Sequence, residues 1–144
     1  MKPNLGYYVQ NINDIVKETE EVGEKMNVYY EEIRTAIDEK KTAELAPERI
    51  AEIQRIFEEG TKEYKIMLEK VAQLRPPARV MGIHKKFEHS YIEYLAGCNE
   101  MVLSLDPEKG IDVDLFNRSE EKQDKATDDI SFSITRMSNL LLKK

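Results

Sequence analysis

Hydrophobic side chains recur at alternating steps of three and four residues along most of the chain. In the first segment this pattern runs from Leu5 to Ala36, with charged residues in the intervening positions. It repeats over residues 50–74, 80–105 and 116–141. Because such steps place side chains on one face of an α-helix, the pattern predicts four amphipathic helices that each bury one face.

Proline residues mark where these helices end. A proline inside a helix costs about 3 kcal/mol, but it is tolerated in the first turn. The chain has five prolines, at positions 3, 47, 76, 77 and 107. Together with the hydrophobic pattern they predict helices over residues 4–43, 47–75, 77–105 and 113–143. Short turns between long helices favour antiparallel neighbours, so we expect an all-α, antiparallel up-and-down four-helix bundle in one domain, residues 1–144.

The first predicted helix is longer than its partners. It spans about forty residues, or roughly 60 Å, whereas the others reach roughly 45 Å. The excess lies at the amino end and includes Leu5, Tyr8 and Ile12, whose apolar face needs cover. The leucine run at residues 140–142 should reach the same end of the bundle. We expect these two groups to contact each other, or to cover a second copy in a homodimer.

The fourth segment has the least regular pattern. Its middle, residues 118–129, is polar, and Ser119 and Gln123 occupy positions where core side chains are expected. If they face Tyr91 or Tyr94, a polar pocket forms between the third and fourth helices. A three-helix core with a detached end is the structural alternative.

Composition narrows the classes of function. Charged residues make up 35% of the chain, above the roughly 25% of an average domain, and 40% are hydrophobic, which is enough for a packed core. The formal net charge of −6 disfavours an extended nucleic-acid surface, which needs a basic stripe. No apolar run is long enough to span a membrane, and no signal-peptide pattern follows Met1. We therefore expect a cytoplasmic protein, provided that Met1 is the natural start.

Residue patterns for catalysis or metal binding are weak. His84 and His89 lie about 140° apart around a helix, which is poor geometry for sharing a metal. Cys98 is the single cysteine, which excludes an internal disulfide and a cysteine-based zinc site. His84, Tyr91 and Cys98 share a helical face, but about 10 Å separates successive members. We predict helix packing for these side chains and no enzyme activity, metal or cofactor. An enzyme that uses carboxylates of the fourth helix is the least favoured alternative.

The turn at residues 106–114 has alternating acidic side chains, as calcium loops do. Its Gly110 stands fifth rather than sixth, and Asn117 takes the place of the final glutamate. The turn therefore fails the calcium-loop pattern. Capping of the fourth helix by Asp112 or Asp114 is the simpler interpretation.

Basic side chains gather at the end of the bundle that contains the Pro76-Pro77 turn. They are Lys2, Arg75, Arg79, Lys85, Lys86, Lys143 and Lys144, with His84 and His89 nearby. Such a charged end steers an anionic partner toward it. A plain solvated surface is the alternative interpretation.

Two tyrosines are predicted to lie outside the hydrophobic faces. Tyr7 and Tyr30 each neighbour a second tyrosine, and only one member of each pair can stay on the buried face. Because exposed tyrosine is enriched at interfaces, Tyr7 and Tyr30 are candidates for a protein-binding surface. A half-covered flank of the bundle is equally compatible with the pattern.

The third predicted helix combines Pro77, His84, Phe87 and Tyr91 with the small apolar stretch Leu95-Ala96-Gly97. This pattern resembles a helix of uncharacterised Gram-positive bacterial helical-bundle proteins, some of which are lipoproteins. The resemblance covers about one helix and implies an α-helical bundle of unassigned role. The chain departs from the lipoprotein members because it lacks a signal peptide and a lipid-bearing cysteine near its start.

These observations favour a non-enzymatic, cytoplasmic helical bundle that acts by protein interaction, as a homodimer or as an accessory or regulatory protein. The alternative is a small-ligand sensor whose pocket uses Tyr91, Tyr94, Ser119 and Gln123. An enclosed polar pocket would favour the sensor, and a dry hydrophobic seam would favour the interaction protein.

Overall fold

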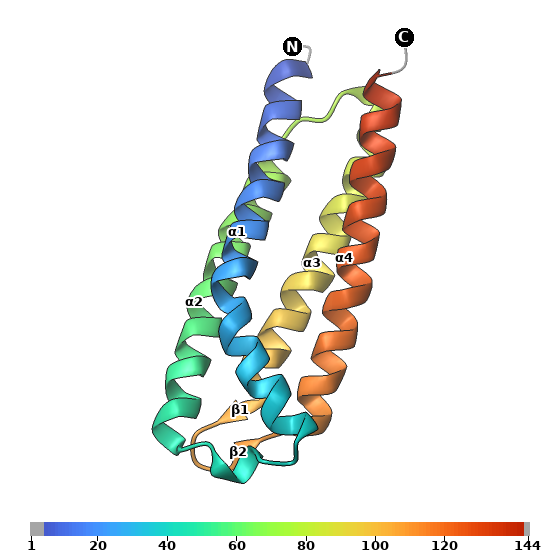
Figure 1. The fold of residues 1–144 in the computed structure, drawn as a ribbon. Coiled ribbons are helices and arrows are strands. Elements are labelled where there is room, and N and C mark those ends of the chain that lie inside the picture. Colours follow the sequence, from blue (N-terminus) through green and yellow to red (C-terminus); the bar gives the residue numbers. More distant parts are fainter. Residues whose placement is uncertain (1–4, 143–144) are drawn as a thin grey trace.

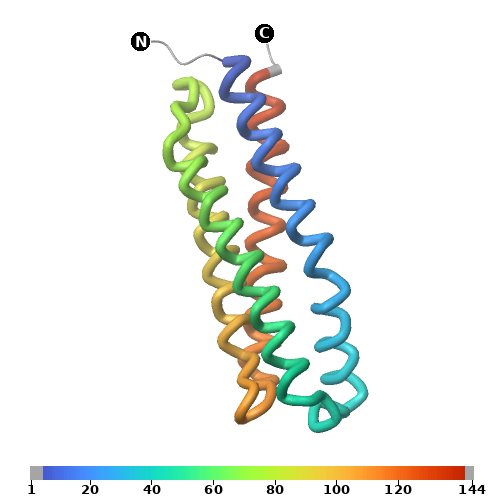
Figure 2. The backbone as a smooth tube through the Cα atoms, turned by 90° about the vertical axis from the view of Figure 1, so that its left-hand side faces the viewer, coloured from blue at the N-terminus to red at the C-terminus, as the bar shows by residue number. Residues whose placement is uncertain are grey.

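The computed structural model describes residues 5–142, which form a bundle of four long helices (Figure 1). These are α1 (Leu5–Asp38), α2 (Pro47–Gln73), α3 (Met81–Leu103) and α4 (Val113–Leu142). Consecutive helices run in opposite directions, so the described chain begins and ends at the same end of the bundle (Figures 1 and 2). The predicted all-α four-helix bundle is confirmed. None of the helices in this described part combines the length and the apolar character that crossing a membrane requires.

A capping motif ends α1 earlier than predicted. The hydrophobic pattern placed its end at residue 43, but the helix ends at Asp38. Lys40 adopts a φ of 57°, in the left-handed region. Its N–H and that of Lys41 donate to carbonyl oxygens in the last turn of α1, at 3.1 and 2.8 Å. These bonds form a Schellman motif, which satisfies the last carbonyl groups before the short 3₁₀ helix η1 (Thr42–Glu44) begins.

The other helix bounds lie closer to the predicted ones. α2 ends at Gln73 rather than at residue 75. The 3₁₀ helix η2 (Ala78–Val80) precedes α3, which therefore begins at Met81 rather than at residue 77. The predicted bounds at residues 4 and 143 lie outside the described residues.

A small hairpin, absent from the predicted elements, connects α3 to α4. Strand β1 (Leu105–Asp106) pairs antiparallel with β2 (Gly110–Ile111). The Asp106 carboxylate accepts two backbone N–H groups of the turn, at 2.9 and 3.2 Å, and Gly110 has a φ of 93° that favours glycine. The Asp112 carboxylate accepts a backbone N–H in the first turn of α4 at 3.0 Å. The predicted capping role of Asp112 is therefore confirmed.

The core consists of two hydrophobic clusters along the bundle. The cluster near the chain ends includes Tyr8, Ile12, Ile15, Val71, Phe87 and Met137. The cluster near the hairpin includes Ile33, Ile53, Phe57, Leu105 and Phe116. Leu140 and Leu141 pack against the first cluster, so Tyr8 and Ile12 receive their predicted cover from this chain, whereas Leu5 is 47% exposed. α1 is the longest helix, with 34 residues against 30 in α4, but Tyr8 and Ile12 are buried rather than left on a free extension. The side chain of Leu142 lies outside the described residues.

Candidate functional site

α3 and α4 pack closely against each other. Gly97 of α3 is buried, and a Cβ atom there would lie 2.8 Å from Gln123 Cγ and 3.2 Å from the carbonyl oxygen of Ser119. Real Cβ contacts are almost always longer, so only glycine permits this approach. At this level of the bundle no room remains between α3 and α4 for the predicted polar pocket.

α1 approaches α4 less closely than α3 does, and side chains bridge the two helices near both ends. Near the hairpin, Arg34 Nη2 donates to Asn117 Oδ1 at 2.9 Å and also pairs with Glu120. Near the chain ends, the Tyr8 hydroxyl lies 3.6 Å from Met137 Sδ. Between these bridges α1 and α4 flank two cavities.

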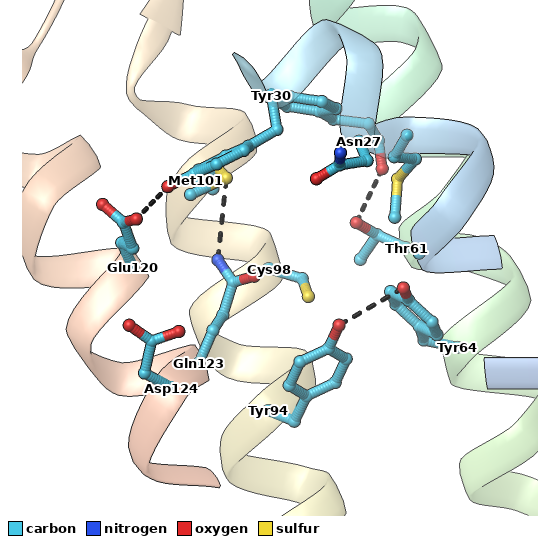
Figure 3. Close-up of a pocket in the computed structure, with 13 residues that line it drawn as sticks. Asn27, Tyr30, Thr61, Tyr64, Tyr94, Cys98, Met101, Glu120, Gln123 and Asp124 are labelled. Carbon is cyan, nitrogen blue, oxygen red and sulfur yellow. Dashed lines mark hydrogen bonds between the residues drawn. The ribbon is translucent and has the colours of Figure 1, made fainter. Parts of the chain in front are cut away.

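The lower cavity, nearer the hairpin, has a volume of about 250 Å³ (Figure 3). All four helices line it: Gly23, Met26, Asn27 and Tyr30 from α1; Phe57, Thr61 and Tyr64 from α2; Tyr94, Cys98 and Met101 from α3; Glu120, Gln123 and Asp124 from α4. Phe57, Tyr64 and Cys98 are buried, whereas Asn27 and Asp124 are exposed. The floor therefore lies on α2 and α3, and the open rim lies on α1 and α4.

The upper cavity, toward the chain ends, has a volume of about 400 Å³. Its lining residues are Val16, Thr19, Glu20 and Gly23 from α1; Phe87, Tyr91 and Tyr94 from α3; Thr127, Ile130, Ser131, Ile134 and Thr135 from α4. The Thr19 hydroxyl donates to the Ile15 carbonyl at 2.7 Å, so the Tyr91 hydroxyl donates to Thr19 Oγ1, also at 2.7 Å. Gly23 and Tyr94 line both cavities, which therefore adjoin. We call the two together the α1–α4 cleft.

Two tyrosines give the lower cavity a hydrogen-bonding floor. The Tyr94 hydroxyl donates to the Tyr64 hydroxyl oxygen at 3.2 Å, and the ring centroids are 5.1 Å apart (Figure 3). This bond uses one of the two hydroxyl protons. Tyr64 is fully buried, with 0% of its surface exposed, so this hydrogen-bonded pair forms the base of the cavity.

Burial controls the protonation of the groups in the floor. It raises the pKa of the Cys98 thiol and of the Tyr64 hydroxyl to about 12, and it also raises the pKa values of Tyr91 and Tyr94. These groups are therefore neutral near pH 7, and the thiol is not an activated nucleophile. They serve as hydrogen-bond donors and acceptors and as apolar surface.

The rim of the lower cavity carries two carboxylates of α4 with different surroundings. Glu120 accepts hydrogen bonds from Arg34 and from Tyr30, and burial and this Glu120 contact raise the pKa of Tyr30 to about 12. Asp124 lies one turn further along α4. Desolvation, and then the charges of Glu120 and Asp128, raise the pKa of Asp124 above its ordinary value. The rim therefore carries two acidic groups, and among the described residues only Glu120 has a basic partner, Arg34.

Three of the four predicted pocket residues lie in the cleft. Tyr91 and Tyr94 line the upper cavity, and Tyr94 and Gln123 line the lower one. Gln123 Nε2 donates to the Gly97 carbonyl at 3.3 Å, which fixes its amide in the lining. Ser119 is not part of the lining: it is fully buried and its hydroxyl donates to a backbone carbonyl of its own helix at 2.7 Å. The lining thus includes residues of both α3 and α4, as predicted, and residues of α1 complete it.

His84 does not belong to the predicted partner surface, because it is buried. Its Nε2–H donates to the Val71 carbonyl at 3.2 Å, and its Nδ1 accepts the Tyr8 hydroxyl proton at 2.8 Å. Burial lowers the pKa of His84, against smaller opposing effects of the Val71 carbonyl and the charge of Glu88. Position 84 shares a helical face with the buried Phe87, so the helical period places it inside.

Tyr30 also departs from its predicted place. It is half-buried, its hydroxyl donates to Glu120, and its ring stacks on Phe116 with centroids 6.0 Å apart. Tyr30 is therefore part of the α1–α4 bridge and the lower cavity. The remaining candidates for a partner surface are exposed: Tyr7, Arg75, Arg79, Lys85, Lys86 and His89. Partner binding by these residues remains a prediction. The other basic side chains predicted at this end, Lys2, Lys143 and Lys144, lie outside the described residues.

Sequence reasoning missed several lining residues, among them Tyr64, Met101, Glu120 and Asp124. For Glu120 and Asp124 the sequence contained one signal, the polar stretch at residues 118–129, in which hydrophilic side chains occur in and beside a helix face that should be apolar. Tyr64 and Met101 followed the ordinary hydrophobic pattern and gave no such signal.

Residues 5–142 contain no group of three or more His, Cys, Asp or Glu side chains placed to hold a metal ion. Comparison of the chain with known protein families, with curated proteins and with solved structures finds no match. The resemblance of residues 77–105 to Gram-positive bundle proteins remains a prediction.

Proposed function

We propose that this protein binds a small organic molecule in the α1–α4 cleft and acts as a ligand sensor or carrier. The supporting observation is the pair of adjoining cavities, about 250 and 400 Å³. Ligand pockets typically measure 300–1,000 Å³ and combine apolar and aromatic walls with a few polar groups. The cleft has this composition, with buried aromatic rings in its floor and a few polar side chains such as Asn27, Gln123 and Asp124 in its lining.

The packing of the bundle suits such a role. α3 and α4 are held together at Gly97, while α1 and α4 are bridged mainly near their two ends. A ligand between these bridges would contact both α1 and α4 and would hold them at a fixed spacing. Its binding would therefore be transmitted to the surfaces of both helices, which links ligand sensing to the predicted interaction and regulatory roles.

A screen of small molecules by thermal unfolding tests the proposal on the full chain. Gly23 lines both cavities, and a Cβ there would make an ordinary contact, 3.5 Å from the Tyr64 hydroxyl. Gly23→Leu should therefore project into the cleft and fill it. On α3, a Cβ added at Gly82 would have no atom within 4 Å, so Gly82→Leu is the matched control.

We expect ligands at one hundred times their dissociation constant to stabilise the wild-type chain by about 2.7 kcal/mol, a shift of roughly 5–10 °C. The same shift should appear in Gly82→Leu and disappear in Gly23→Leu. Unliganded Gly23→Leu should unfold at or above the wild-type temperature, because leucine replaces a helical glycine. The proposal is wrong if no molecule stabilises the chain, or if stabilisation is equal in Gly23→Leu.

A further inference from the structure

The lining of the cleft is charged with one sign only. Its acidic side chains are Glu20 in the upper cavity and Glu120 and Asp124 in the lower one. Among the described residues that line either cavity, none is Lys, Arg or His. An anionic ligand would therefore meet repulsion without a compensating partner, whereas a cation would be attracted.

Asp124 is the carboxylate whose charge remains uncompensated. Glu120 is already paired with Arg34 and accepts the Tyr30 hydroxyl proton. Asp124 forms no ion pair or hydrogen bond with any other residue in the described range 5–142, and the charges of Glu120 and Asp128 act on it to raise its pKa. Figure 3 shows the side chains of Glu120 and Asp124 on the same side of α4, at the edge of the cavity. A positive group bound there would relieve the repulsion between these carboxylates.

The walls next to this carboxylate suit the body of an organic cation. Tyr30, Tyr64 and Tyr94 come from three different helices and line the same lower cavity as Asp124. The faces of aromatic rings attract cations, and quaternary ammonium groups are bound in this way. Met26 and Met101 add polarisable sulfur atoms, which adapt to ligands of irregular shape.

We propose that the ligand of the α1–α4 cleft is an organic cation with an apolar body, bound with its ammonium group near Asp124 and its body against the tyrosines of the lower cavity. This inference rests on the proposed function, since it names the ligand class of the same cleft. An inorganic cation fits less well, because Ca²⁺ takes six to eight oxygen ligands and Asp124 is the one carboxylate in the lower cavity without a partner in residues 5–142.

Three probes of one shape test the role of charge: phenyltrimethylammonium, its neutral isostere tert-butylbenzene, and the anion benzenesulfonate. Binding to the full chain is measured by NMR titration of backbone amides. We expect phenyltrimethylammonium to bind about three- to tenfold more tightly than tert-butylbenzene, and benzenesulfonate to bind most weakly. The perturbed amides should lie in the four helices around the lower cavity, and Gly23→Leu should abolish the perturbation.

A matched pair of variants tests the role of Asp124. Asp124→Asn should weaken binding of phenyltrimethylammonium about three- to fivefold and leave binding of tert-butylbenzene unchanged, because only the cation uses the carboxylate. Asp128→Asn removes the same charge one turn away, at an exposed residue outside both linings, and should change either affinity by less than about twofold. Circular dichroism of each variant checks that the bundle is folded.

These experiments distinguish a wrong ligand class from the absence of a ligand site. Equal or tighter binding of tert-butylbenzene, abolished by Gly23→Leu, overturns the cation inference and leaves the cleft as a ligand site. Equal effects of Asp124→Asn and Asp128→Asn overturn the placement of the ammonium group. If no probe gives a perturbation that Gly23→Leu removes, both the cation inference and the proposed function fail for molecules of this size.

Discussion

Removal of one hydroxyl group, in Tyr8→Phe, is expected to lower the free energy of unfolding by about 1–3 kcal/mol. Tyr8 connects three helices: it belongs to α1, its hydroxyl donates to His84 Nδ1 of α3 at 2.8 Å, and it lies 3.6 Å from Met137 Sδ of α4. Both members of the Tyr8–His84 pair are buried, with 1% and 5% of their surface exposed. Water therefore has little access to replace the lost bond.

The magnitude follows from the hydrogen bonds of the imidazole. His84 Nε2–H donates to the Val71 carbonyl, which leaves Nδ1 as an acceptor with Tyr8 as its donor. In Tyr8→Phe the ring remains and fills nearly the same volume, but Nδ1 loses its donor. If the imidazole proton moved from Nε2 to Nδ1, the Nδ1–H would face the phenyl ring without an acceptor, and the Val71 carbonyl would lose its donor. Either way one buried polar group is unsatisfied, which costs about 1–3 kcal/mol.

Urea unfolding followed by circular dichroism measures this cost, with Tyr7→Phe as the control. Tyr7 is the adjacent residue, receives the same substitution and is 66% exposed, so its effect should stay within about 0.5 kcal/mol. The midpoint of Tyr8→Phe should fall while the slope with urea stays constant. Equal midpoints for the two variants would show that the buried Tyr8–His84 bond does not stabilise the bundle.

Two further predictions use the same unfolding assay. Gly97→Ala should destabilise by about 1–2 kcal/mol because its Cβ would press on the backbone of α4, whereas Gly82→Ala, with open space, should be neutral or stabilising by up to about 1 kcal/mol. Burial lowers the pKa of His84 below its unfolded value near 6.5, so the folded state binds fewer protons and stability should fall as pH drops from about 7 through this range. His84→Gln should remove the loss of stability that His84 causes at low pH, whereas His89→Gln, at an exposed position, should retain it. Equal dependence of stability on pH in the two variants would show that His84 does not cause this loss.

The four helices could be predicted because their buried residues follow the helical period almost without interruption. In α2, for example, Ile50, Ile53, Phe57 and Tyr64 are spaced by three, four and seven residues and all are buried. Helix ends were less predictable where the backbone departs from the common rules. The Schellman motif of α1 uses Lys40, a residue type that rarely adopts a positive φ, so the sequence contained no glycine to mark it.

The cleft depends on distances between helices, which a pattern along one helix does not encode. The sequence pointed to Tyr91, Tyr94 and Gln123 as pocket residues because the polar side chains of Ser119 and Gln123 take core positions of the fourth helix that could face these tyrosines. It placed the pocket between α3 and α4 alone, whereas α1 also lines both cavities and α2 the lower one, since Gly97 brings α3 and α4 close together at its level. The same closeness explains why Ser119 is buried instead of lining a cavity.

The position of the cleft follows from the connectivity of the bundle. Short connections fix α1 to α2, α2 to α3 and α3 to α4, but no loop joins α1 to α4 (Figure 1). Only side chains set the spacing of these two helices, through Arg34 near one end and Tyr8 near the other. A change in that spacing alters side-chain packing but leaves the three connections between consecutive helices intact. Under the proposed function, a ligand in the α1–α4 cleft would therefore contact two helices whose spacing no connection fixes.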